Sequence, residues 1–294
     1  MSDKSREQVK RYWESQHEDG DPDTFLDHPM IQAYVAIRSC GDLTSHQTLA
    51  VEAIRSRTRP GSRILSVGCG GAEKEMHFVN DLPDRHFVGL DLAESALERA
   101  RQKIEVNGVK NLELVSGDFN DLSLDANDFD VVLGSGAIHH IENLEGFWAQ
   151  CRHTLRPGGI VVGQEYVGPN RFQWTDVQCE IGTALLREHV PAEHKVHHDR
   201  VEPIPLAVII AEDPSEAVRS EEILSTLEAA DFKIVEHRGA GCGLLQPMLM
   251  YQMHTFDPSN WAHNRRLAEL FAIEQRYLDD GTAGDAYAMF VAEP

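Results

Sequence analysis

The 294 residues are 41% hydrophobic and 26% charged, the composition of a globular protein that can bury a full core. The formal net charge of -21 excludes free nucleic acid as an expected partner, because such affinity comes from neutralising phosphates with basic side chains. The five cysteines are scattered, which favours a reducing compartment. The sequence shows no apolar signal core and no run near the ~20 apolar residues of a membrane span. We therefore expect a cytoplasmic protein with no membrane partner.

Residues 1–60 precede the first expected strand and contain helical stretches with aromatic side chains such as Tyr12 and Trp13. We interpret this segment as an N-terminal helical cap that closes over a ligand. Beyond it, short apolar runs alternate with segments of helical period, which predicts βαβ units and a parallel sheet. The runs are R-I-L-S-V, H-F-V-G-L, N-L-E-L-V, F-D-V-V-L and G-I-V-V-G, all between residues 63 and 163.

Two helices between these strands are predicted from their apolar spacing. One covers Ala93 to Ile104 with apolar residues at spacings of four, three and four. The other begins at Leu144 and is expected to stop at Arg156, because Pro157, Gly158 and Gly159 follow, and the next strand is expected to begin at Ile160.

The carboxyl-terminal half is less regular. Residues 165–217 contain a helix-like segment and then a proline-containing stretch that we expect to be irregular, together an insertion over the sheet. Ser220 is expected to cap a following helix. Strands are predicted at F-K-I-V-E-H-R (232–238) and A-Y-A-M-F-V-A (286–292), with a helix around 261–278 between them.

The first strand runs into the glycine loop G-C-G-G-A, residues 68–72. Glycines let the backbone turn sharply and approach a ligand closely at a helix start. The third glycine of a dinucleotide fingerprint is missing, because Glu73 occupies its position, and no Lys-Ser pair marks a phosphate-binding loop. A merely structural tight turn is the alternative interpretation of this loop.

Acidic residues follow the next two strands. Asp91 ends the second strand, where a carboxylate can accept hydrogen bonds from both hydroxyls of a ribose. After the third strand, Asp118 could accept from an adenine amino group while Phe119 covers the ring. Taken singly, Asp91 also fits an acid at a helix amino terminus, and Asp118 a solvated turn residue.

In this order the motifs V-G-C-G-G-A, V-G-L-D-L, S-G-D-F, H-H-I and L-R-P-G-G resemble the class I S-adenosylmethionine-dependent methyltransferase family. The resemblance covers about residues 60–165. It implies an α/β, Rossmann-like sheet of seven mostly parallel strands in the order 3-2-1-4-5-7-6, flanked by helices. The implied division is a helical cap over 1–60 and a methyltransferase domain over 61–294, with a lid and acceptor insertion after strand five at 165–217.

The resemblance also implies a cofactor site for S-adenosylmethionine. Its amino-acid part would lie on the glycine loop, its ribose on the end of strand two and its adenine after strand three. Two positions depart from the family, which often has an acid at the position of Ser66 and a glycine at that of Ala72. The expected cofactor-binding residues are Gly68, Gly70, Asp91, Leu92, Asp118, Phe119, Ser135 and Gly136.

The acceptor is expected between L-G-S-G-A-I-H-H-I (133–141) and Q-E-Y-V-G-P-N-R-F-Q-W (164–174), which follow neighbouring strands. The adjacent imidazoles of His139 and His140 must point differently, so one is expected to reach the acceptor while the other packs structurally. A structural role is the alternative for each residue taken singly. The catalytic candidates are His140, Glu165 and Tyr166, and the substrate-binding candidates are Tyr12, His139, Arg171 and Gln173.

A second histidine group, His194, His197 and His198, has the spacing i, i+3 and i+4, which could hold a metal if the segment were helical. The flanking Pro191 and acidic residues favour a solvated connection instead, so no metal site is expected.

The predicted function is transfer of a methyl group to a small-molecule acceptor, on oxygen or nitrogen. The segment from Gln164 and D-P-S-E-A-V-R-S (213–220) are similar to bacterial methyltransferases of glycan or natural-product pathways. Alternatives are an S-adenosylmethionine-binding enzyme of different chemistry, an inactive partner subunit, a nicotinamide-dependent dehydrogenase and a non-enzymatic binding module. Both a monomer and a homodimer are compatible with the sequence.

Overall fold

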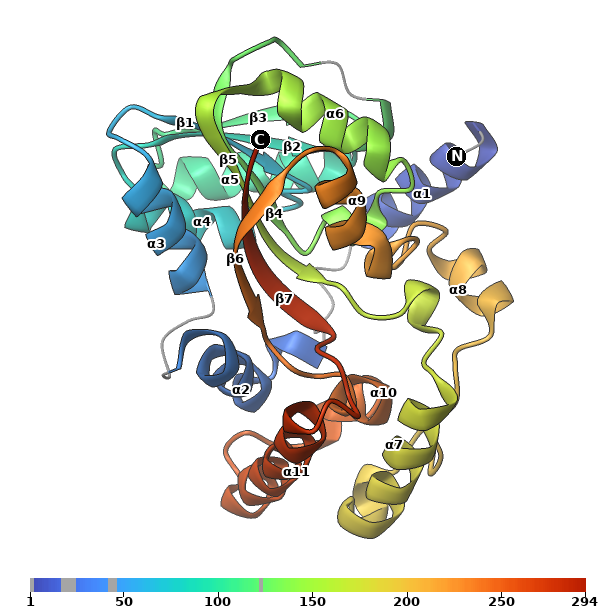
Figure 1. Cartoon of the computed structure of the whole chain (residues 1–294). Helices are drawn as coiled ribbons and strands as arrows, with labels where there is room; N and C mark the ends of the chain where they lie inside the picture. Colours follow the sequence, from blue (N-terminus) through green and yellow to red (C-terminus); the bar gives the residue numbers. More distant parts are fainter. Residues whose placement is uncertain (1–2, 17–24, 42–46, 122–123) are drawn as a thin grey trace.

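The computed structural model describes residues 3–16, 25–41, 47–121 and 124–294 (Figure 1). Seven strands form one sheet in the order β3-β2-β1-β4-β5-β7-β6, in which β7 runs antiparallel to both of its neighbours. The predicted strand order and the mostly parallel sheet are confirmed. The strands are β1 (Arg63–Val67), β2 (His86–Asp91), β3 (Leu112–Ser116), β4 (Phe129–Ser135), β5 (Leu155–Tyr166), β6 (Lys233–Gly239) and β7 (Tyr287–Glu293).

Helices cover both faces of this sheet because consecutive strand residues point to opposite sides. Ile64 packs with the helices of one face and Leu65 with those of the other. The first face carries α3 (Gln47–Arg57), α4 (Glu73–Asp81) and α5 (Glu94–Asn107), and the second carries α6 (Leu144–Thr154) and α9 (Ile223–Ala229) (Figure 1). In α5 the predicted apolar stripe is confirmed, since Leu97 and Ala100 are fully buried.

Two local predictions are wrong. Strand β5 begins at Leu155 instead of Ile160, because Phe129 pairs with Leu155 before the register shifts and Val131 pairs with Ile160. Pro157, Gly158 and Gly159 therefore form a bulge inside the strand. Ser220 does not cap α9, because its buried hydroxyl donates to the carbonyl of Gly168 at 2.8 Å, and a 3-10 turn precedes the helix.

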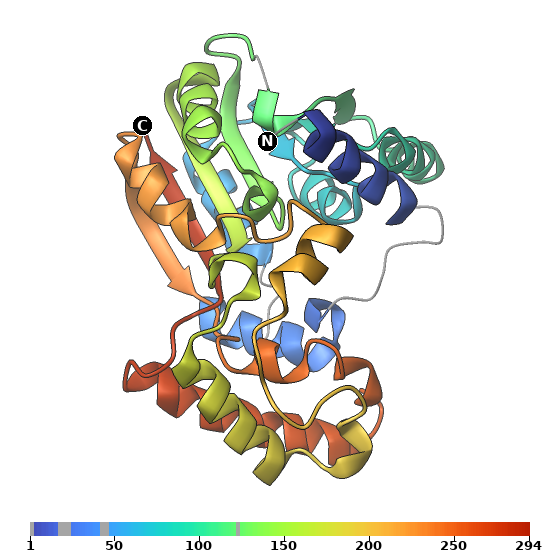
Figure 2. The ribbon, with the colours of Figure 1, turned by 90° about the vertical axis from the view of Figure 1, so that its right-hand side faces the viewer.

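A second layer of helices lies beyond the carboxyl end of β5 (Figures 1 and 2). It comprises α2 (Pro29–Cys40), α7 (Asp176–His189), α10 (Leu245–Leu249) and α11 (Trp261–Asp279). Ile31, Leu186, Met248 and Leu270, one from each helix, share a hydrophobic cluster with Tyr166 at the end of β5. Within the described parts of the chain, no helix has the length and apolar character needed to cross a membrane.

The helices of residues 1–60 lie in three different places. Helix α1 (Asp3–Gln16) lies against α5 and α8 (Leu206–Glu212), α2 belongs to the second helical layer, and α3 packs on the sheet (Figure 2). The side-chain amide of Gln8 in α1 donates to the backbone carbonyl of Ile210 at 3.1 Å. The hydroxyl of Ser95 in α5 donates to the backbone carbonyl of Glu14 in α1 at 3.3 Å. The division at residue 60 stays a prediction. Helix α8 begins after Pro205 in a stretch expected to be irregular.

A fully buried carboxylate anchors the second helical layer. Glu274 of α11 accepts hydrogen bonds from the backbone N–H groups of Cys242, Leu244 and Leu245 at 2.8–3.0 Å. We expect Glu274→Gln to lower the free energy of unfolding by about 1–3 kcal/mol, because its amide brings N–H groups against these donors. Denaturant unfolding checks this, with the half-exposed Glu269→Gln as the control. Equal losses in the two variants would contradict the anchoring role.

Candidate active site

The glycine loop touches the loop that follows β4. Gly68 has a φ of +65°, and a Cβ added there would lie 2.3 Å from the Cβ of Ala137. Only glycine fits this close approach. At Gly70 the φ is +51°, but an added Cβ would meet no atom within 4 Å, so this position opens on free space. Ala72 adopts a φ of +63° without being glycine, which shows that the turn tolerates a side chain there.

Asp91 at the end of β2 joins the glycine loop to the start of α5. One carboxylate oxygen accepts from the N–H of Gly70 at 2.8 Å, and the other accepts from the N–H of Ala93 at 2.9 Å. These two contacts fix the carboxylate at the edge of the sheet, beside the glycine loop.

The residues expected around adenine also lie near this loop. Phe119 begins a 3-10 turn (Phe119–Asp121), and its ring would come within 3.7 Å of a Cβ on Gly68. One oxygen of Asp118 accepts from the N–H of Asn120 at 2.8 Å. Leu92 is half-buried after Asp91. The candidates from the first three strands thus follow the carboxyl ends of β1, β2 and β3, and their roles stay predictions.

A cation at this edge was missed by the sequence reasoning. Lys74, in the first turn of α4, donates to the carbonyl of Ser135 at 2.7 Å, and a Cβ on Gly136 would lie 2.6 Å from its Nζ. The ammonium group therefore lies at the end of β4, beside the glycine loop that precedes α4. A lysine in the first helical turn after such a loop was the available signal.

An acid lies beneath the glycine loop even though Ser66 replaces the one that the family resemblance implies. The hydroxyl of Ser66 donates to the Glu75 carboxylate at 2.7 Å, and both side chains are buried. Burial raises the pKa of Glu75, although the serine hydrogen bond opposes this. The carboxylate at this position therefore comes from α4 and not from β1.

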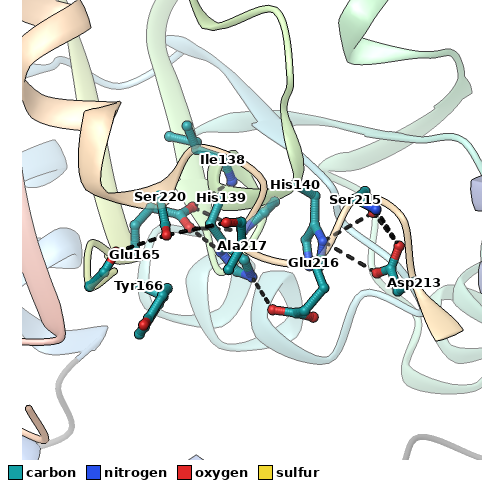
Figure 3. A network of polar contacts seen from close by, with 12 residues as sticks. Ile138, His139, His140, Glu165, Tyr166, Asp213, Ser215, Glu216, Ala217 and Ser220 are labelled. Carbon is teal, nitrogen blue, oxygen red and sulfur yellow. Dashed lines mark hydrogen bonds and ion pairs between the residues drawn. The ribbon is translucent and has the colours of Figure 1, made fainter. Parts of the chain in front are cut away.

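Glu165 holds the loop that carries the two imidazoles (Figure 3). Its carboxylate accepts from the N–H groups of Ala137 and Ile138, each at 2.9 Å, and lies 2.8 Å from Nδ1 of His139. Burial alone raises the pKa of Glu165, but the imidazole and the two N–H groups lower it by more. Because an ionised carboxylate only accepts hydrogen bonds, His139 donates from Nδ1.

His140 is held by the end of the insertion (Figure 3). Its Nδ1 lies 3.2 Å from the hydroxyl of Ser215 and 3.5 Å from Oδ2 of Asp213. The Ser215 hydroxyl donates to Oδ1 of Asp213 at 2.6 Å, so its oxygen accepts from the Nδ1–H of His140. Burial, followed by the neighbouring His139, lowers the pKa of His140. The Trp13 ring in α1 lies nearly perpendicular to this imidazole, with centroids 5.0 Å apart.

The two imidazoles lie side by side, with ring centroids 4.1 Å apart, and both face Glu216. Nε2 of His139 is 3.9 Å from Oε1 of Glu216. Burial raises the pKa of Glu216, and the nearby Asp213 adds to this. The guanidinium of Arg171 donates to the backbone carbonyl of Glu216 at 3.1 Å, which places a cation beside these acids.

Three other candidates make contacts that shape the loops. The hydroxyl of Tyr166 donates to the carbonyl of Pro169 at 3.2 Å, and the ring is buried. The amide of Gln173 donates to the carbonyls of Arg171 and Ile204, each at 2.8 Å. Burial and nearby acids raise the pKa of Tyr12 in α1 to about 12. The roles predicted for these residues remain untested.

The second histidine group lacks the α-helix that a shared metal would need. A 3-10 turn ends at His194, whose ring stacks on Phe256 with centroids 4.1 Å apart. His198 faces Gln252, and the ring of His197 faces Tyr251 and His254. Among the residues with described positions, these three histidines do not bring ligand atoms together as a metal site requires.

Comparisons with known proteins agree with the sequence motifs. Residues 64–159 match the family described as "Methyltransferase domain". The 24-methylenesterol C-methyltransferase 2 of Arabidopsis thaliana is 32% identical over 132 residues, which cover 45% of this chain and 36% of that protein. A demethylmenaquinone methyltransferase of Listeria welshimeri serovar 6b is 27% identical over 122 residues, 41% of this chain and 52% of that protein. The chain thus matches about half or less of the length of these relatives.

Solved structures share the fold at low sequence identity. Geranyl diphosphate C-methyltransferase of Streptomyces coelicolor A3(2), in complex with Mg2+, geranyl diphosphate and S-adenosyl-L-homocysteine, has a TM-score of 0.57 at 10% identity and covers 98% of this chain and 97% of that one. Phosphoethanolamine N-methyltransferase 2 of Haemonchus contortus has a TM-score of 0.54 at 14% identity, and the match covers 97% of this chain and 60% of that one. The [4+2]-cyclase SpnF has a TM-score of 0.53 at 15% identity, and the match covers 98% of this chain and 95% of that one.

Proposed function

Residues 64–159 are a methyltransferase domain of the class I S-adenosylmethionine-dependent family, and from this premise we propose that the chain transfers a methyl group from S-adenosylmethionine to a small-molecule acceptor. The observation that supports this most is the convergence of Gly68, Asp91 and Phe119, from three successive strand ends, beside one open glycine position. Open α/β sheets bind ligands at this edge.

The cofactor would bind along that edge. In the proposed arrangement Asp91 accepts from the ribose hydroxyls, Phe119 covers the adenine and Gly70 lies against the amino-acid part. Lys74 would pair with the carboxylate of that part, because its ammonium lies beside the glycine loop. The sulfonium is then expected near Ser135 and Gly136, at the end of β4.

In the reaction the methyl–sulfur bond breaks as the bond from the acceptor to the methyl carbon forms. The electron pair of the broken bond stays on sulfur, so the sulfonium becomes a neutral thioether. A hydroxyl or ammonium acceptor also loses a proton. Holding the two reactants in line can supply ~7–11 kcal/mol of the barrier, so positioning is the main task of the protein.

The narrower proposal is transfer to an oxygen or nitrogen of a glycan or natural-product intermediate. His140 would orient or deprotonate the acceptor, since its ring lies after β4 under α1. Glu165 would position the loop instead of acting as the base, because three donors already bind its carboxylate. Tyr12, His139, Arg171 and Gln173 would surround the acceptor, with Tyr166 at its far wall.

Transfer to carbon is the second candidate. Aromatic rings continue from the site into the second helical layer, where Tyr166 contacts Phe172 with centroids 5.1 Å apart and Phe172 stacks on Trp174 at 6.1 Å. Such rings suit an apolar acceptor. The names of the sterol and geranyl diphosphate relatives likewise state C-methylation.

The cytoplasm stays the proposed location, since none of the five cysteines forms a disulfide.

Calorimetry with S-adenosylmethionine, S-adenosylhomocysteine and NAD tests the proposal. We expect micromolar binding of the first two and no comparable affinity for NAD. Asp91→Ala should weaken S-adenosylhomocysteine binding by about 10- to 100-fold, because hydrogen bonds to a charged group contribute ~1.5–3 kcal/mol each. Asp280→Ala, at the exposed end of α11, is the control. Saturable NAD binding without S-adenosylhomocysteine binding would overturn the proposal in favour of a dehydrogenase.

An acceptor screen separates the remaining alternatives. Methyl transfer from labelled S-adenosylmethionine is measured with hydroxyl, amine and unsaturated apolar acceptors. Labelled product is the expected result. Tight cofactor binding without transfer to any class would favour different chemistry or an inactive partner subunit, and loss of all cofactor binding would favour a non-enzymatic module.

A further inference from the structure

Three potential metal ligands converge at the acceptor side of the site. One ligand atom from each of His139, His140 and Glu216 lies within 4.8 Å of the other two, and within the described ranges no further group of three or more meets this condition. Ligand atoms of a tetrahedral ion with bonds of about 2.0–2.1 Å lie about 3.3 Å apart. The Nε2 of His139 is 3.9 Å from Oε1 of Glu216, about 0.6 Å more than this spacing.

Both imidazoles are oriented as metal ligands are. A metal-binding histidine usually donates its other ring N–H to a carboxylate or carbonyl, which fixes the tautomer and the ring. His139 donates from Nδ1 to Glu165 at 2.8 Å. His140 donates from Nδ1 toward Ser215, and Asp213 holds that serine. Each ring therefore keeps the lone pair of Nε2 for an ion.

The charge around the two rings favours a cation. Asp213, Glu165 and Glu216 place three carboxyl groups around the two imidazoles, and the guanidinium of Arg171 donates to the backbone carbonyl of Glu216. Oδ2 of Asp213 is buried and accepts no hydrogen bond in the structure. A divalent ion between the rings and Glu216 would offset this excess of negative charge.

We propose that His139, His140 and Glu216 bind one divalent transition-metal ion, of the Zn²⁺, Mn²⁺ or Co²⁺ type, at the acceptor side of the methyl-transfer site. Two imidazoles and one carboxylate suit these ions better than Mg²⁺ or Ca²⁺, which prefer oxygen ligands throughout. Three protein ligands leave coordination positions open.

The open positions identify an acceptor class, an inference that rests on the proposed function. An acceptor with two neighbouring oxygen atoms, such as a vicinal diol or a hydroxy acid, would chelate the ion. The ion would lower the pKa of the bound hydroxyl, and the methyl group would go to that oxygen while its proton leaves to water. With Nε2 on the ion, His140 would orient the acceptor through the metal and would not act as its base. Sulfur keeps the electron pair of the broken bond, so no oxidant or reductant is needed.

Metal titration of the chelator-treated chain tests the site without S-adenosylmethionine. We expect one Zn²⁺ per chain by calorimetry, and with Co²⁺ the visible absorption of an ion bound by nitrogen and oxygen. His140→Ala and Glu216→Gln should each weaken Zn²⁺ binding by at least the ~10–100-fold that loss of a ligand's outer hydrogen-bond partner costs. His197→Ala, in the other histidine group, should leave the affinity unchanged.

Each outcome bears on the proposal independently of the cofactor. Sub-stoichiometric binding, or equal affinity in wild type and Glu216→Gln, would overturn the metal site, and Glu216→Gln keeps this test available should a histidine variant unfold. Loss of affinity in His197→Ala alone would move the ion to the other histidine group. S-adenosylhomocysteine binding by the metal-free chain is measured in parallel, so failure of the metal site and failure of the proposed function give different results.

Discussion

Gly68→Ala is expected to weaken S-adenosylhomocysteine binding by at least about 100-fold and to lower the free energy of unfolding by about 2–4 kcal/mol. The added methyl would lie 2.3 Å from the Cβ of Ala137, which cannot rotate away. The φ of +65° adds the cost of a left-handed conformation, about 1–2 kcal/mol for a residue with a Cβ. Relief requires the loops after β1 and β4 to separate at the proposed cofactor site. Calorimetry and denaturant unfolding measure the two effects.

Gly70→Ala is the matched control two residues away. Its φ of +51° carries a similar backbone cost, but the methyl would enter open space with no atom within 4 Å. We expect a stability loss of about 1–2 kcal/mol. Because the proposed site places the cofactor against Gly70, we also expect the variant to bind S-adenosylhomocysteine more weakly. Unchanged S-adenosylhomocysteine affinity in both variants would remove the glycine loop from the cofactor site.

The sheet could be predicted because its signals are local. Each of the first five strands is a short apolar run bounded by turn residues, and the motif order supplied the strand order. The bulge in β5 was missed for a physical reason: a proline and two glycines end a helix in either case, and only the pairing of Leu155 with Phe129 shows that the strand has already begun.

The second helical layer could not be derived from sequence. Its members are separated by long stretches of chain, and each apolar face is buried only by the others. Ile31 in α2 and Leu270 in α11 belong to one cluster although more than two hundred residues lie between them. Periodicity predicts that such a helix has a buried face, but it does not identify the partner.

The candidate site divides in the same way. Gly68 and Asp91 could be found because they follow strands, and parallel strands end at one edge. Asp213, Ser215 and Glu216 follow helix α8, which the sequence did not predict, and no spacing rule relates them to His139 and His140. The resemblance of D-P-S-E-A-V-R-S to other methyltransferases gives no position for its acids, whereas the structure places them around the imidazoles.

Glu165→Gln is expected to lower the single-turnover rate of methyl transfer by about 10²–10⁴-fold, the range typical when an acid–base group loses its placement. Glu165 accepts from Ala137 and Ile138 and orients His139 through Nδ1. A glutamine amide of the same size turns an N–H group toward one of these donors, so the imidazole loop must shift. The Gly68 contact with Ala137 lies at the start of that loop, whereas Asp91 and Phe119, the residues proposed for ribose and adenine, follow β2 and β3.

The predicted loss therefore falls on kcat, while the affinity for S-adenosylhomocysteine changes by no more than about 3-fold, less than 1 kcal/mol. A merely destabilised variant would lose affinity and rate together, so this split identifies a positioning residue. Tyr166→Phe is the matched control on the neighbouring position, since its hydroxyl donates to the carbonyl of Pro169 and not to the loop that carries the imidazoles. His140→Ala is measured alongside, with cofactor saturating. Near-wild-type rates in all three variants would place the acceptor away from the loop after β4, because a nucleophile that approaches the sulfonium from this side must pass these side chains.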